Sequence, residues 1–239
     1  MPQTDRASTS GSDTMFGKFG GRNRRFRLAS AGLTYPFALV IVALLLAGCG
    51  PNDQKEDYYP LGVGSTWTYE IRAWDVTPSG TETSFSGTGT IQATESDKLP
   101  TGEDVVQFMR TISESDAATD SVTYVDTGYY RTGGDCVLHY ANKADTTVAD
   151  TLLKLPLAKD VSWLRGGTRL RVTEESDVTV KAGTYRAWKV EAIYDTSQHR
   201  SACWWYADGV GEVKWHVVQV LQPDFTVVTH WELHNAAIR

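Results

Sequence analysis

Three histidines and a glutamate stand close together near the end of the chain, on two stretches that alternate apolar and polar residues. The alternation predicts two strands, 212–222 and 225–234. Placing Trp215 and Trp231 on one face requires a three-residue loop and sets His216 opposite Glu232. Three imidazoles and one carboxylate can hold Zn²⁺ with an open position, but diagonal spacings of roughly 7–8 Å favour a solvated His–Glu pair instead. The candidate metal ligands are His216, His230, Glu232 and His234.

Two of the three cysteines, Cys136 and Cys203, lie on predicted strands. In an oxidising compartment we expect them to form a disulfide, whose closed loop of 67 residues would stabilise the fold by roughly 4 kcal/mol. Buried free thiols are the alternative. His139 is three residues from Cys136, so the two side chains point to opposite faces of a strand and do not form a catalytic dyad.

The third cysteine, Cys49, ends a segment typical of an export signal. A cluster of arginines at 22–27 precedes the apolar run 37–47, which ends Leu46-Ala-Gly-Cys49. This ending resembles the lipobox of bacterial lipoproteins, which implies cleavage before Cys49 and lipid on its sulfur and amine. The resemblance also implies that Gly50 permits export to the outer membrane. The alternative, an uncleaved membrane anchor over 28–48, is weakened by polar residues in its first half.

The signal divides the chain into an N-terminal extension and signal peptide (1–48), a lipidated cysteine with a flexible tether (49–57) and one domain (58–239). Translation starts at Met1 or Met15. Removing 1–48 takes away six basic and two acidic residues, leaving 17 basic and 27 acidic ones and a net charge of −10. That charge argues against binding to nucleic acid. We expect the protein to associate with the membrane through the lipid anchor alone.

The domain is predicted to be all-β. Short alternating stretches joined by turns favour antiparallel pairing, and about ten strands favour a barrel or strongly curled sheet, with a two-sheet sandwich as the alternative. Gly209 and Gly211 suit a bulge or a tight turn, and a short helix or turn is expected over 152–159. The predicted strands are 65–72, 84–94, 104–112, 121–130, 135–141, 168–180, 188–194, 201–206, 212–222 and 225–234.

Four ordered motifs resemble those of a widespread group of uncharacterised bacterial lipoproteins and secreted β domains. The resemblance implies an exported all-β domain and assigns no activity. Similarity to lipoprotein-sorting proteins is one of architecture only. The motifs are LGVGSTWTY at 61–69, LKLPL at 153–157 with Trp163 after it, VTVKAGTYRAWKV at 178–190 and WYADGVGEVK at 205–214.

The chain has eight tryptophans and eleven tyrosines, which is more than turns and sheet edges can accommodate, so many of them are expected to lie in the interior. We expect Trp67, Tyr69, Trp188 and Tyr194 to line a ligand cavity, with packing in a filled core as the alternative. No catalytic or cofactor motif is found, and no cofactor is expected. The predicted function is therefore a non-enzymatic, lipid-anchored envelope protein that binds an apolar molecule or another envelope protein. A metal-dependent envelope hydrolase and a structural subunit of a surface assembly are the alternatives.

Overall fold

The structure is a computed structural model that describes residues 56–80, 82–115, 122–144, 149–195, 200–222 and 225–239. All of them belong to the second of the two units into which the chain divides, Gln54–Arg239. Cys49 and the predicted signal peptide lie outside the described residues. Within those residues, no helix is long and apolar enough to cross a membrane.

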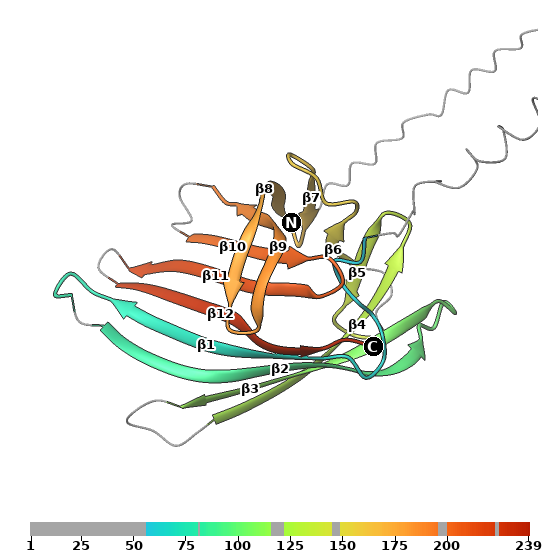
Figure 1. The fold of residues 1–239 in the computed structure, drawn as a ribbon, viewed down its shortest axis with the longest axis horizontal. Helices are drawn as coiled ribbons and strands as arrows, with labels where there is room; N and C mark the ends of the chain where they lie inside the picture. Colours follow the sequence, from blue (N-terminus) through green and yellow to red (C-terminus); the bar gives the residue numbers. More distant parts are fainter. Residues whose placement is uncertain (1–55, 81, 116–121, 145–148, 196–199, 223–224) are drawn as a thin grey trace, which may run out of the picture. The chain divides into compact units, whose positions relative to one another are not determined.

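The described residues form one antiparallel sheet of twelve strands, with the order β6-β5-β4-β3-β2-β1-β12-β11-β10-β9-β8-β7 (Figure 1). Sequence neighbours therefore pair throughout the sheet, except that β6 and β7 form its two edges and β1 pairs with β12. The strands are β1 (Thr66–Val76), β2 (Glu82–Lys98), β3 (Asp104–Ser115), β4 (Val122–Gly133), β5 (Cys136–Tyr140), β6 (Asp150–Lys154), β7 (Ser162–Arg165), β8 (Thr168–Val180), β9 (Gly183–Ile193), β10 (Arg200–Ala207), β11 (Gly211–Gln222) and β12 (Phe225–Ala237).

The sheet curls into a nearly closed barrel, as its two edge strands come together. The Nε1–H of Trp163 on β7 donates to the carbonyl oxygen of Thr151 on β6, at 3.1 Å. The β8–β9 hairpin lies across β11 and β12 (Figure 1), where the N–H of Ala182 donates to the carbonyl oxygen of Leu233 at 3.1 Å. Curling protects the edges that an open sheet would expose. The predicted all-β barrel is confirmed, and the sandwich alternative is not adopted.

Two strands, β6 and β7, were not predicted from the sequence. The segment 152–159, expected to be a short helix or turn, belongs to β6 as far as Lys154 and forms bends and a turn after it, and β7 follows at Ser162–Arg165. Leu152 and Leu153 are both buried, so this part of the chain shows no alternation of apolar and polar residues. A short apolar run without alternation does not distinguish a strand from a helix.

The segment before β1 crosses one end of the barrel. The N–H of Gly209, in the β10–β11 turn, donates to the carbonyl oxygen of Asp57 at 2.9 Å, and the N–H of Gly64 donates to that of Ala93 on β2 at 2.8 Å. The C-terminus meets the same segment, as the N–H of Arg239 donates to the Oγ of Ser65 at 2.9 Å. One end of the barrel is thus closed by the chain itself.

Tyr59 fills the space beneath this crossing segment. Its ring lies 5.7 Å from that of Phe108 on β3 and 5.4 Å from that of Tyr130 on β4. Trp67 is buried beside them and stacks on Phe108 with ring centres 5.7 Å apart. These aromatic contacts make the closed end a packed floor, since buried aromatic pairs add about 0.5–1.5 kcal/mol to the burial of their area.

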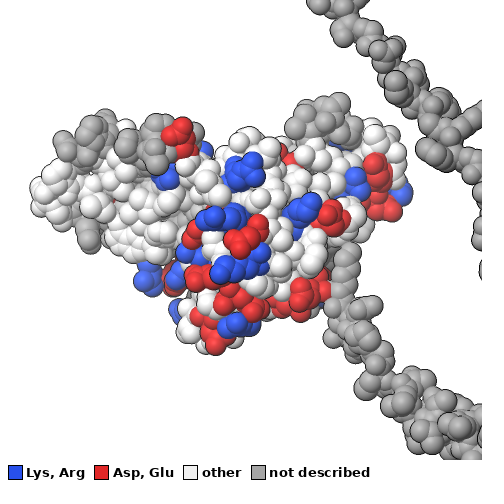
Figure 2. All heavy atoms as spheres, turned by 90° about the horizontal axis from the view of Figure 1, so that it is seen from above, with Lys and Arg blue, Asp and Glu red and all other residues white. Residues whose placement is uncertain are grey.

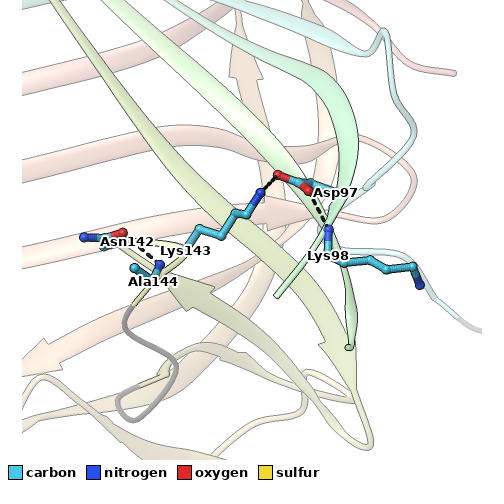
Figure 3. Close-up of polar contacts among 5 residues, drawn as sticks. All are labelled: Asp97, Lys98, Asn142, Lys143 and Ala144. Atoms are coloured by element: carbon cyan, nitrogen blue, oxygen red, sulfur yellow. Dashed lines mark hydrogen bonds and ion pairs between the residues drawn. The ribbon is translucent and has the colours of Figure 1, made fainter. Parts of the chain in front are cut away.

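The connection between β5 and β6 is tied to the end of β2 by an ion pair. Lys143 Nζ lies 2.5 Å from Asp97 Oδ2, and Asp97 also accepts from the backbone N–H of Lys98 at 2.7 Å (Figure 3). On the face seen in Figure 2, Lys and Arg side chains lie among Asp and Glu side chains. Charges of both signs are therefore mixed on this face, which offers no broad basic field for nucleic acid.

Candidate functional site

A cavity of about 530 Å³ occupies the interior of the barrel. Its volume lies within the range usual for small-molecule sites. Aromatic and aliphatic side chains make up one part of its wall, and titratable side chains make up another. Besides tyrosines, the titratable lining residues are Arg110, Asp126, His139, Asp150, Arg165 and Glu212.

Three tryptophans line the cavity side by side on adjacent strands, in addition to tyrosine and phenylalanine side chains. Trp204 on β10 pairs in register with Trp215 on β11, which pairs with Trp231 on β12. The rings of Trp215 and Trp231 lie 5.3 Å apart, and all three residues line the cavity. The Nε1–H of Trp215 is buried and has no acceptor among the described residues.

Glu212 contributes a carboxyl to the floor of the cavity. Tyr206 pairs with Glu212, whereas the preceding residue, Trp205, pairs with Lys214, so Val213 is an extra residue in β11. This β-bulge turns Glu212 to the face that carries Tyr206. The hydroxyl of Tyr206 donates to its Oε2 at 3.4 Å, and its carbonyl oxygen accepts from the Tyr69 hydroxyl at 2.9 Å.

Burial raises the pKa of Glu212 to about 7, because a low-dielectric surrounding disfavours the charged form. Arg165, the Tyr206 hydroxyl and Arg110 oppose this rise. Burial also lowers the pKa of His139, which keeps that imidazole neutral near pH 7. The floor of the site is therefore a carboxyl that changes its protonation state near neutral pH.

The remaining charged groups lie on β3 to β7. Arg110 and Asp126 form an ion pair across β3 and β4, with Arg110 Nε 3.1 Å from Asp126 Oδ1. His139 pairs in register with Asp150 across β5 and β6. Arg165 ends β7 and interacts with Glu212 electrostatically. This arrangement can hydrogen-bond a polar ligand, but it shows no nucleophile activated by a base.

Of the four predicted lining residues, three line an internal cavity. Trp67 and Tyr69 line a small one of about 30 Å³ beside Glu212, and both are buried. The Nε1–H of Trp67 donates to the carbonyl oxygen of Val210 at 2.6 Å. Tyr194 lines the large cavity, whereas Trp188 packs against a buried cluster around Tyr206. Trp67 and Tyr69 therefore belong mainly to the packed floor of the barrel.

The predicted register of the last hairpin is wrong. His216 pairs with His230 and Lys214 with Glu232, because a bulge near Leu221 changes the count of residues in the loop. The His216 Nδ1 and His230 Nε2 atoms lie 2.7 Å apart, and burial lowers the pKa of both histidines. Within the described ranges, no group of three or more His, Cys, Asp or Glu side chains could hold a metal ion, so His234 is not brought into a ligand set.

The predicted disulfide is also absent. Cys136 and Cys203 are free thiols, on β5 and β10, and six strands separate these two in the sheet order. Burial raises the pKa of both thiols, which makes them less reactive. The topology of a meandering barrel could not be inferred from the spacing of two cysteines.

Sequence reasoning missed the titratable side chains inside the barrel. Strict alternation places Glu212 on the outer face with Lys214, and only a bulge brings it inside. The pair Gly209 and Gly211 signalled such a bulge, and both have positive φ, of 68° and 95°. Arg110, by contrast, follows the same alternation as Phe108, and polar residues on an inward face indicate a cavity instead of a filled core.

No family model and no curated protein matches the sequence. Among solved structures, a Bacteroides fragilis protein described as exported, with a YmcC-like fold, is 12% identical; the match covers 75% of this chain and 98% of that one, with a TM-score of 0.44. A Parabacteroides distasonis protein described as a lipoprotein is 12% identical over 75% and 98% of the two chains, with a TM-score of 0.34. A β-barrel-like protein of a domain of unknown function from Brucella abortus is 8% identical over 76% and 100%, with a TM-score of 0.39.

Proposed function

We propose that the chain is a lipid-anchored protein of the bacterial envelope, held in the outer membrane, whose barrel binds a small molecule without transforming it. The observation that carries the binding role is the cavity of about 530 Å³, which is walled by a row of tryptophans and a group of titratable side chains. The anchor rests on the sequence Leu46-Ala-Gly-Cys49, which lies outside the described residues.

The anchor is tested by mass spectrometry of protein extracted from membranes. The mature chain should begin at an acylated Cys49, and Cys49→Ser should leave the precursor unprocessed. Fractionation on a density gradient then places the acylated chain in the outer or the inner membrane. A mature chain that retains residues 28–48 would contradict the anchor.

The binding role is tested with three probes of different chemistry: palmitate, dodecyltrimethylammonium and the neutral disaccharide cellobiose. Thr168 lines the cavity at the start of β8, so Thr168→Trp should fill part of the cavity and weaken the binding of whichever probe binds. Thr179→Trp is the matched control, as Thr179 is exposed near the other end of the same strand. Binding of at least one probe that only Thr168→Trp weakens supports the proposal. If no probe binds saturably, or if both variants behave alike, the cavity is not a ligand site.

The second candidate function is docking of an envelope protein on β4. Val122 and Tyr124, which share one face of β4, are 46% and 56% exposed, and Val125 on the opposite face is 60% exposed, so this end of the strand presents apolar side chains on both faces. A photoreactive residue in place of Tyr124 should crosslink one discrete partner in intact cells, and the same residue in place of exposed Val63 should not. Equal crosslinking from both positions would argue against a docking surface on β4.

A further inference from the structure

The cavity has two chemically different walls, which are half a barrel apart. The tryptophan row lies on β10, β11 and β12, whereas Asp126 and His139 lie on β4 and β5. In the order of twelve strands, β4 is six places from β10, and β5 is six places from β11. Because six places are half of the circumference, the aromatic row and the polar row face each other across the cavity.

The polar wall holds one ion pair and one pair of cross-strand neighbours. Arg110 is paired with Asp126, and His139 stands opposite Asp150 on the neighbouring strand. Each pair offers hydrogen-bond donors and acceptors side by side, since a guanidinium only donates and a carboxylate only accepts. A ligand that carries hydroxyl groups, which both donate and accept, can bond to each member of such a pair.

The charges around the cavity nearly balance. Two arginines, Arg110 and Arg165, face the carboxyls of Asp126, Asp150 and Glu212, and Glu212 is protonated for part of the time at neutral pH. A strongly charged ligand would therefore meet both signs of charge. A purely apolar ligand would leave ion pairs dehydrated, which costs free energy.

We propose that the cavity binds a neutral saccharide, with the apolar face of its rings on the Trp204–Trp215–Trp231 row and its hydroxyls on Arg110, Asp126, His139 and Asp150. This inference rests on the proposed ligand-binding function and names its ligand class. The C–H face of a pyranose ring packs on an indole as other apolar groups do, and the hydroxyl edge meets the opposite wall.

The test uses the full chain, purified in a detergent without a sugar headgroup. Isothermal titration is carried out with a panel of neutral sugars: glucose, galactose, N-acetylglucosamine, maltose, cellobiose and chitobiose. At least one should bind saturably, and Trp204→Ala should weaken its binding about tenfold or more, as expected for the loss of a stacking surface. The matched control is Trp205→Ala, because Trp205 lies next to Trp204 on the opposite face, near Lys189 and Lys214.

Asp126→Asn tests the polar wall independently, in case Trp204→Ala does not fold. The change preserves the shape of the side chain and removes one charge from the half-exposed Arg110–Asp126 pair. It should also weaken sugar binding about tenfold, and an unchanged circular dichroism spectrum would show that the fold is intact. Binding of palmitate or dodecyltrimethylammonium that Thr168→Trp weakens, with no sugar bound, would overturn the saccharide inference and leave the binding function intact. Sugar binding that Trp204→Ala and Asp126→Asn leave unchanged would also overturn it. If no probe of any class binds, both proposals fail.

Discussion

Replacing Glu212 with glutamine should make the barrel more stable at alkaline pH and leave its stability in mild acid almost unchanged. Glu212 lies on the floor of the cavity, where burial raises its pKa to about 7 from an ordinary value of 4.5. Glutamine has nearly the same shape and cannot ionise. The comparison of the two proteins therefore isolates the free energy of placing one negative charge on this floor.

The magnitude follows from the two pKa values. Between pH 4.5 and pH 7 the folded chain retains a proton that the unfolded chain releases, so stability falls as pH rises through this window and is constant above it. A difference of about 2.5 between the pKa values corresponds to about 3 kcal/mol. Because Glu212 is partly exposed to the cavity, we expect about 2 kcal/mol. For a domain of this size, that is about 4–8 °C in Tm.

The assay is thermal unfolding of both proteins at several pH values from 5 to 9, followed by tryptophan fluorescence. The advantage of Glu212→Gln should be small at pH 5, grow through pH 6 and 7, and level off above pH 8. Glu232→Gln is the control, since Glu232 is paired with Lys214 on the outer face. Parallel pH profiles for wild type and Glu212→Gln would refute the argument that burial of this carboxyl costs stability.

Three further predictions concern the barrel wall. Cys136 and Cys203 should both react with an alkylating reagent after unfolding without reductant, as peptide mapping would show; recovery of a linked peptide would contradict the free thiols. Trp163→Phe should lower the free energy of unfolding by about 1 kcal/mol in urea titrations, because it removes the hydrogen bond that joins β7 to β6; an unchanged midpoint would show that the bond adds nothing. Gly89→Ala should lower Tm and shift the tryptophan emission, because a Cβ there would lie 2.6 Å from the Trp231 ring; a variant with wild-type melting would contradict that contact.

Alternation was enough to predict most of the fold. In β1, Trp67, Tyr69 and Ile71 are buried as their spacing predicts, and the short connections between strands predict antiparallel neighbours. The same rule failed where both faces of a strand are covered. Leu152 and Leu153 are both buried in β6, because the segment lies at the closure of the barrel, and closure is a property of the whole sheet that no local pattern reports.

The candidate site depended on residues that local rules place incorrectly. The last hairpin shows the reason: Trp215 and Trp231 share one face as predicted, but they pair directly, because the expected residue count in the loop was wrong. The two thiols show the same limit, because their spacing along the chain holds no information on how many strands separate them in the sheet. Pairwise distances in a barrel depend on the strand order and on bulges, and neither is visible in the alternation of one strand.

The extra residue in β11, Val213, changes the strand register and thereby determines which groups line the cavity. Without the bulge at Val213, strict alternation would turn Glu212 to the outer face, where Lys214 pairs with Glu232. The cavity floor would then carry only tyrosines and apolar side chains, and the positive charge of Arg165 would lose its electrostatic interaction with this carboxyl. The bulge adds no large side chain and leaves the pairing of Trp215 with Trp231 in place. The chemistry of this cavity is therefore determined by the backbone of the β10–β11 turn as much as by the residue types of its wall.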